Sequence, residues 1–258
     1  MISLTIFDGI YDNKTHRRLD LKSFDELEAL LYKLSDEELE NKKDANLISP
    51  AVYIKDSTRK NDNVVSWGGW CAVDVDDVSF DVPLEKYLEE LFPSWRYVCY
   101  STASSTIDKP KFRIVFALSQ RIETEEINAF WHALQKSIGE MGDEATKDKS
   151  RMFYIPARYK KAYNFIFSSI GKDFIKTKEL INKVANEYKA ITNTGWYLKM
   201  YQIMVAIAGN AVKRRYPINA KEIADLCKQF DNSTGNWYKN RSMEAEADRA
   251  IEYIYKNM

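Results

Sequence analysis

The chain has 258 residues, of which 45% are apolar and 29% charged, an ordinary profile for one large or two modest folded domains. Its net charge is zero, and it has no run of about 18 apolar residues, so a membrane-spanning helix is excluded. The three cysteines are scattered and the N-terminus lacks a signal-peptide pattern, so we expect reduced thiols and a cytoplasmic location. Because these cysteines and the two histidines do not cluster, a structural zinc site is excluded as well.

The first two thirds of the chain mix β-type alternation with helical periodicity in an irregular order, which predicts an α+β domain. The predicted strands are Leu4–Phe7, Val52–Lys55, Cys71–Asp76, Arg96–Tyr100, Lys111–Leu118 and Met152–Ile155. The predicted helices are Phe24–Leu34 after the N-cap candidate Ser23, Pro83–Phe92 from a proline suited to a first turn, and Glu123–Glu140.

Beyond about residue 172 the strand signals stop and helical periodicity takes over. We predict helices at Thr177–Tyr188, Gly195–Arg214, Ala220–Phe230 and Ser242–Tyr255, separated in part by breaks at Pro217–Asn219 and Asp231–Trp237. The domain boundary is expected between Lys172 and Thr194. The sequence therefore predicts an α+β domain at residues 1–175 and a small all-helical domain at residues 190–258.

The charges are unevenly distributed along the chain. Residues 1–144 carry 17 Lys and Arg against 27 Asp and Glu, whereas residues 145–189 carry 11 against 4. A basic segment beside an acidic one could hold a polyanion near a carboxylate metal site. A solvated, Lys-rich surface would give the same pattern.

The first segment that points to chemistry is Ala72–Asp77, an apolar strand pattern interrupted by acids. Because successive side chains of a strand face opposite sides, Asp74 and Asp76 share one face. Two close carboxylates repel each other unless something neutralises them, and a hard divalent cation such as Mg²⁺ does so. The alternative is a strand that runs into a polar turn, with Asp76 and Asp77 as its capping residues.

A hydroxyl-rich stretch, Ser101–Thr106, precedes a predicted basic strand. Its hydroxyl and amide groups can donate hydrogen bonds to a phosphate, and Ser104 and Ser105 are the candidate ligands. In the strand that follows, Lys111 and Arg113 share one face, opposite to apolar side chains. Two cations after such a stretch would suit a triphosphate, although charges that protect an edge strand would give the same pattern.

A third acidic cluster lies within Met141–Pro156, after a predicted helix. Asp143 stands at the turn and would complete a two-metal site of the kind that holds attacking and leaving oxygens. Asp148 competes with Asp143 for this role. Arg151, at the start of a short aromatic strand, is a candidate phosphate contact. The alternative is a helix-capping loop whose charges are simply solvated.

In this order and spacing, the three segments resemble the archaeo-eukaryotic type primase-polymerase superfamily. The resemblance is closest to the branch carried by phages, plasmids and other mobile elements, and it covers roughly residues 1–165. It implies an RRM-like catalytic domain joined to a second αβ unit. The part from Thr194 onward is similar to the helical domain that often follows such primases.

The resemblance also implies roles for individual residues. Asp74, Asp76 and Asp143 would be catalytic and would hold two Mg²⁺ or Mn²⁺ ions. The residues implied in nucleotide binding are Ser104, Ser105, Lys111, Arg113 and Arg151. The family usually has a histidine in the middle motif, and Ser105 is the best positional match for it in this chain. Because a serine carries no positive charge, Lys111 and Arg113 would have to provide it.

The implied function is metal-dependent nucleotidyl transfer by a DNA primase or polymerase that makes or extends primers during replication of a phage or mobile element. The implied partners are a single-stranded DNA template, an NTP or dNTP, and a replicative helicase domain or subunit. Trp95, Tyr159 and Trp196 are available for base stacking, but such aromatics belong more often to the core. We expect Asp74→Ala to abolish nucleotide addition while leaving the fold intact.

Other classes of function stay open. A metal-dependent nuclease would use the same acidic residues, so the sequence hardly separates it from a polymerase. A non-catalytic replication module that binds single-stranded DNA would agree with the missing histidine, whereas the Asp74 and Asp76 pair speaks against it. The amphipathic segment Trp196–Val212 also permits an interaction protein whose helical tail docks on a partner.

Overall fold

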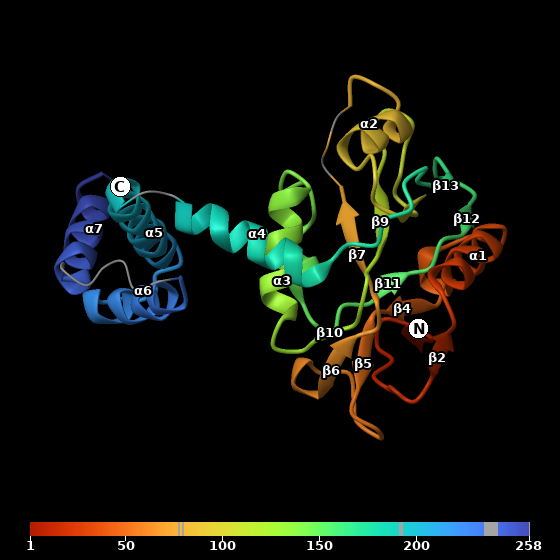
Figure 1. The fold of residues 1–258 in the computed structure, drawn as a ribbon, viewed down its shortest axis with the longest axis horizontal. Helices are drawn as coiled ribbons and strands as arrows, with labels where there is room; N and C mark the ends of the chain where they lie inside the picture. The colour runs from red at the N-terminus through yellow and green to blue at the C-terminus, as the bar shows by residue number, and fades with distance from the viewer. Residues whose placement is uncertain (77, 79, 191–192, 235–241, 258) are drawn as a thin grey trace. The chain divides into compact units, whose positions relative to one another are not determined.

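The computed structural model describes residues 1–76, 78, 80–190, 193–234 and 242–257. Contacts between residues divide the chain into two units, Met1–Ile181 and Asn182–Met258. The first unit mixes sheets with helices and the second is helical, so the predicted fold class is confirmed (Figure 1). In the described ranges, no helix combines the length and the apolar character needed to cross a membrane.

The central sheet carries the predicted motifs. Its strands are antiparallel and run in the order β13 (Ile166–Ser168), β8 (Tyr97–Ser101), β9 (Phe112–Ala117) and β7 (Trp70–Val75). Along the chain, helix α2 (Leu84–Leu91) falls between β7 and β8, and helix α3 (Ile127–Ser137) falls between β9 and β13. This gives the strand–helix–strand–strand–helix–strand succession of the predicted RRM-like domain.

A second four-stranded sheet brings together β11 (Phe153–Tyr154), β4 (Leu47–Ser49), β1 (Ile2–Phe7) and β2 (Arg18–Leu21), in that order, and helix α1 (Phe24–Ser35) follows β2. The other paired strands are β5 (Ala51–Tyr53), β6 (Val64–Trp67) and β10 (Ile122–Glu123), and β3 (Glu38–Leu39) with β12 (Arg158–Tyr159). Short 3₁₀ turns occur at Lys42–Asp44, Asn61–Asn63 and Glu144–Lys147.

The main core lies between one face of the central sheet and α1 with the second sheet. It includes Trp70, Ala72, Val98, Val115, Phe24, Leu27, Leu31, Leu4 and Ile48, all of them buried. The register pairs Ala72 with Val115, and two residues further along β7 it pairs Asp74 with Arg113. Because residues two apart on a strand share a face, this charged pair points toward the same side as the core, at its end.

The opposite face of the central sheet is covered by aromatic side chains from the α2 region. The ring of Phe92 lies 5.4 Å from that of Phe116, and the ring of Phe80 lies 5.9 Å from that of Phe112. Trp95 stacks on Phe92 at 5.3 Å. Both faces of the strands that hold the predicted site are therefore packed. Trp95 belongs to this packing, as expected for a core aromatic.

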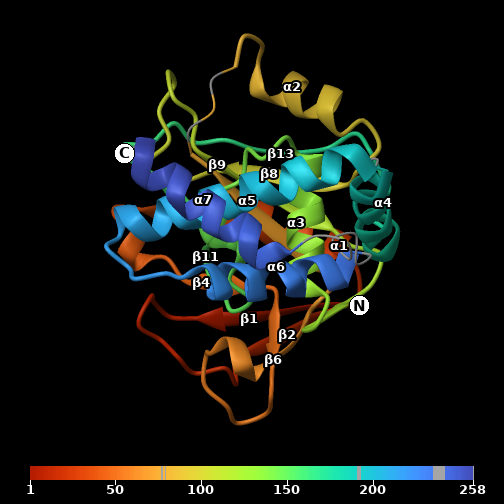
Figure 2. The same cartoon turned by 90° about the vertical axis from the view of Figure 1, so that its left-hand side faces the viewer.

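The second unit contains the helices α5 (Asn193–Lys213), α6 (Ala220–Thr234) and α7 (Met243–Asn257), while α4 (Thr177–Ala190) spans the division between the units (Figure 2). The core of the second unit contains mainly alanine, methionine and isoleucine side chains, among them Met200, Met204, Ala208, Ile223, Ala224, Ala247, Ala250 and Ile254. A Cβ added at Gly209 would lie 3.3 Å from Ile254 Cδ1, so a small residue there lets α5 and α7 approach closely.

Several predicted bounds need correction. The predicted helix Glu123–Glu140 begins only at Ile127, because Ile122 and Glu123 pair with β6. The predicted break at Asp231–Trp237 is wrong up to Thr234, where α6 continues, and its last three residues lie outside the described ranges. The strands β2, β4, β6 and β13 were not predicted, because their short segments show little alternation.

Candidate functional site

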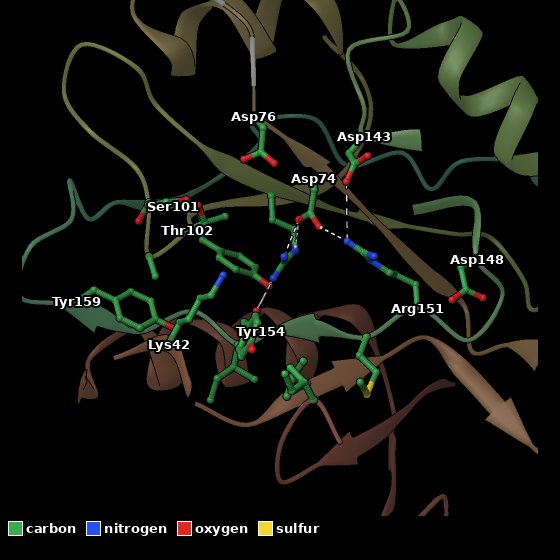
Figure 3. A pocket seen from close by; sticks show the side chains of 18 of the residues that line it. Lys42, Asp74, Asp76, Ser101, Thr102, Asp143, Asp148, Arg151, Tyr154 and Tyr159 are labelled. Atoms are coloured by element: carbon green, nitrogen blue, oxygen red, sulfur yellow. Dashed lines mark hydrogen bonds and ion pairs between the residues drawn. The ribbon is translucent and has the colours of Figure 1, made fainter. Parts of the chain in front are cut away.

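A cavity of about 360 Å³ opens where the ends of β7 and β8 face β4 and β11 (Figure 3). This volume lies in the range of small-molecule sites in proteins. The charged side chains that line it include Asp74, Asp76, Asp143 and Asp148 together with Lys42, Arg59, Arg113 and Arg151. The fold thus brings the two predicted acidic segments, the hydroxyl-rich and basic segment between them and further cations to one place.

The deepest part of the cavity, here called the floor, is a buried ion pair. Arg113 Nε and Nη2 each lie 2.6 Å from Asp74 Oδ1, and the two side chains are 6% and 11% exposed. Arg113 Nη1 also donates to the Tyr100 hydroxyl and to the backbone carbonyl of Tyr154. Burial lowers the pKa of Arg113, but the charge of Asp74 and the Tyr100 contact outweigh it, so the net pKa is raised. The guanidinium is therefore permanently charged and neutralises Asp74.

This arrangement changes the expectation for two residues. Arg113, predicted to contact a triphosphate, lines the cavity but already donates hydrogen bonds to Asp74, Tyr100 and Tyr154. The substitution Asp74→Ala would also leave the Arg113 charge buried without this partner, so a loss of stability is expected beside the predicted loss of nucleotide addition. Asp74 is consequently a structural residue as well as a candidate ligand.

Nearer to solvent, the cavity has a rim formed by Asp76 and Asp143. The Asp76 side chain is 43% exposed and its Oδ1 lies 3.6 Å from Lys111 Nζ. The Asp143 amide donates to the backbone carbonyl of Asp74 at 2.8 Å, which fixes the loop after α3 against β7. Arg151 Nη2 lies 3.6 Å from Asp74 Oδ2 and 3.8 Å from Asp143 Oδ2. Arg151 therefore links floor and rim.

Of the two candidates for the third carboxylate, Asp143 is the one next to Asp74. Asp148 Oδ1 accepts hydrogen bonds from the amide and the hydroxyl of Ser150, so it shapes the turn before Arg151. Figure 3 shows Asp148 on the far side of Arg151 from the other acids. Asp77, which could have capped β7, lies outside the described residues.

The hydroxyl-rich stretch forms one wall of the cavity. Ser101, Thr102, Ala103 and Ser104 line it, so the candidate phosphate ligand Ser104 faces the cavity. Ser105 is 1% exposed, and its hydroxyl accepts a hydrogen bond from the Lys111 amide at 3.1 Å. Ser105 therefore holds the turn to the start of β9 and does not line the cavity, whereas Lys111 extends toward Asp76.

Lys42, Arg59 and Tyr159 also line the cavity, and the motifs did not indicate any of them as ligands. Lys42 Nζ lies 5.6 Å from the centre of the Tyr154 ring, which places a cation at the cavity mouth. Within the described part of the chain, the Nε groups of Arg59 and Arg151 are buried and have no hydrogen-bond partner. Lone cations in polar loops carry no signal in a sequence, because most of them are simply solvated.

The chemistry of the donors suits a hard divalent cation, since carboxylate oxygens are its preferred protein ligands. No three His, Cys, Asp or Glu side chains among the described residues gather closely enough to hold a metal ion by themselves. Mg²⁺ commonly takes one or two carboxylates and completes its coordination with water and substrate phosphates. The residues therefore fit a cation that is shared with phosphate oxygens.

Comparison with known protein families assigns the chain to one of them. Residues 21–196, well over half of the sequence, match the VapE N-terminal domain family. The chain belongs to this family. VapE N-terminal domains are associated with phage and plasmid replication, which agrees with the predicted origin in a phage or other mobile element. The matched region includes all three acidic and basic motifs.

Other comparisons add little. No curated protein matches this VapE N-terminal domain. Among solved structures, it is similar to the AEP domain of the primase-polymerase of cyanophage S-2L, with a TM-score of 0.38 and 11% sequence identity. That superposition covers 54% of this chain and 69% of the cyanophage chain.

Proposed function

We propose that this VapE N-terminal domain is a DNA primase-polymerase, which adds nucleotides to a primer on single-stranded DNA during replication of a phage or mobile element. One observation carries the proposal. Carboxylates from β7 and from the loop after α3 line the same cavity as several cations and a hydroxyl-rich wall. Carboxylates suit the metal ion, and the cations suit the triphosphate that nucleotidyl transfer requires.

The cations have distinct roles in this proposal. Arg151 lies between Asp74 and Asp143, so its guanidinium would meet a phosphate that approaches the carboxylates. Arg59 would contact the phosphates from the loop after β5, and Lys42 would attract them from the cavity mouth. Arg113 would act indirectly, because its ion pair holds the Asp74 side chain in one orientation. The basic segment at residues 145–189 would attract the template strand.

The metal would be Mg²⁺ or Mn²⁺, two ions in the complete site. Asp76, Asp143 and the Asp74 Oδ2 atom would provide protein ligands for the two ions together, one or two carboxylates to each. When bound, the metal would lower the pKa of the attacking 3′-hydroxyl and stabilise the departing pyrophosphate. The main-chain hydrogen bond between Asp143 and Asp74 keeps two of these ligands at a fixed spacing before any substrate binds.

The test is extension of a labelled primer on a single-stranded template with Mg²⁺ or Mn²⁺ and all nucleotides. Asp76→Asn removes a rim carboxylate, and Asp225→Asn is the matched control, because Asp225 is a similarly exposed acid in an ion pair with Lys221. We expect wild type and Asp225→Asn to extend the primer. The rate of primer extension by Asp76→Asn should fall further than the roughly 10–100-fold that is typical when a residue that only supports a metal ligand is lost. Equal extension by Asp76→Asn would contradict the proposal.

A second function is favoured by one specific observation, the neutralisation of Asp74 by Arg113. A carboxylate that already has a buried counter-ion has less need of a metal, as in a non-catalytic module that binds single-stranded DNA. Such a module would bind labelled single strands with a steep salt dependence and would extend no primer. Shortening of the labelled strand in the same assay would instead indicate a nuclease.

A further inference from the structure

Tyr159 is the last residue of β12 and is held by its backbone. Its amide donates to Asn164 Oδ1 at 2.9 Å, and Asn164 Nδ2 donates back to the Tyr159 carbonyl at 2.8 Å. The neighbouring strand β3 pairs with β12, and Leu39 is the residue opposite Tyr159. The ring is consequently fixed in place, and Tyr159 is only 4% exposed.

Tyr159 lines the cavity, and its hydroxyl is buried without a hydrogen-bond partner among the residues that the structure describes. The neighbouring Tyr100 hydroxyl differs, because it accepts from Arg113 and donates to the Tyr154 carbonyl. A buried hydroxyl without a partner lowers stability, so such a group calls for an explanation, and beside a cavity a ligand can supply it. The cavity therefore holds one rigid, neutral group that the fold does not use.

The position of Tyr159 indicates which part of a ligand it meets. Figure 3 shows its ring on the opposite side of the cavity from Asp143 and Arg151, with the hydroxyl end directed toward Lys42. If the phosphates of a nucleotide lie by the carboxylates and Arg151, its sugar end lies toward Tyr159. Burial raises the pKa of Tyr159 to about 12, so the phenol stays a neutral hydrogen-bond donor and acceptor at physiological pH.

We infer that the Tyr159 hydroxyl forms a hydrogen bond with the sugar of the bound nucleotide and makes the cavity favour ribonucleotides over deoxyribonucleotides. The inference rests on the proposed binding of a nucleotide in this cavity. A ribose offers one more hydroxyl than a deoxyribose. A buried group that waits for a hydroxyl partner discriminates against the ligand that lacks it, because it is then left unpaired.

The test is a comparison of ATP and dATP binding in the presence of Mg²⁺, measured by titration calorimetry on the full chain. Tyr159→Phe removes only the unpartnered hydroxyl, so the ring packing is kept. The matched control is Tyr97→Phe. Tyr97 is also a buried tyrosine whose hydroxyl has no partner among the described residues, but it does not line the cavity.

We expect wild type and Tyr97→Phe to bind ATP more tightly than dATP. Tyr159→Phe should weaken ATP binding by about tenfold, which corresponds to the loss of one hydrogen bond, and should change dATP binding little. Unchanged affinities for both nucleotides in Tyr159→Phe, with binding intact, would overturn this inference and leave the proposed function standing. Absence of nucleotide binding by the wild type would overturn both.

Discussion

Asp74 in β7 and Asp76 just after its end stand two residues apart, yet their surroundings on the floor and the rim of the cavity differ. Asp74 is buried against a guanidinium that the neighbouring strand places directly opposite, whereas Asp76 reaches solvent and lies 3.6 Å from Lys111. The difference teaches that two nearby carboxylates can serve stability and chemistry separately. Substitutions on the floor should change the free energy of unfolding, and substitutions on the rim should change function.

The largest effect is expected from Arg113→Met. It removes the buried partner of the Asp74 carboxylate and leaves the longer contact to Arg151, which should lower the free energy of unfolding by about 3–5 kcal/mol. Urea denaturation followed by fluorescence measures this. Lys111→Met, the matched change at the rim, should cost no more than about 1 kcal/mol because that pair is partly exposed.

The ion pair itself can be isolated by adding Asp74→Leu to Arg113→Met. Replacing both buried charges by apolar groups should restore part of the lost stability. If the double variant is as unstable as the sum of the two single variants, the floor is not a coupled pair and the comparison fails.

An intermediate effect is expected from Gly142→Ala, in the loop that joins floor and rim. An added Cβ would lie 2.3 Å from both Gln135 Nε2 and Val73 Cγ1, so the loop and the Asp143 that it carries must shift. Overpacking of this kind should cost about 1–3 kcal/mol, measured by thermal denaturation. At Gly9, where nothing lies within 4 Å of an added Cβ, the same substitution should be close to neutral.

The smallest change in stability is expected from Asp76→Asn. Its ion pair is 43% and 27% exposed on the two sides, so its loss should alter the free energy of unfolding by less than about 1 kcal/mol. Urea denaturation in parallel with the primer-extension assay checks this. A loss of stability comparable to that of Arg113→Met would mean that floor and rim are one structural unit.

Much of the fold was predictable from local patterns. The alternation predicted β7 and β9, which hold Asp74 and Arg113, whereas Asp76 and Lys111 lie just beyond the ends of these strands. The helices of the second unit were also predicted closely, because helical periodicity is a local signal that persists over many residues.

The pairing of Asp74 with Arg113 could not be predicted in this way. It depends on the register between β7 and β9, which brings together two residues that are 39 positions apart in the sequence. The pattern within either strand does not predict that register. Ser105 was expected in the cavity because a hydroxyl-rich turn does not reveal which hydroxyl its own backbone uses. Arg59 reaches the cavity from a distant segment, so only the three-dimensional fold reveals it, and the sequence offered Tyr159 as a stacking aromatic without placing it at this cavity.

The hydrogen bond from the Asp143 amide to the Asp74 carbonyl joins main chain to main chain. The backbone spacing between these two residues is therefore set by a main-chain contact and not by their carboxylates. A variant that keeps the fold but carries other residues at both positions would hold the new side chains at the same backbone separation. The chemistry of the cavity could thus be changed by substitution, while its dimensions depend on the loop between α3 and Asp143.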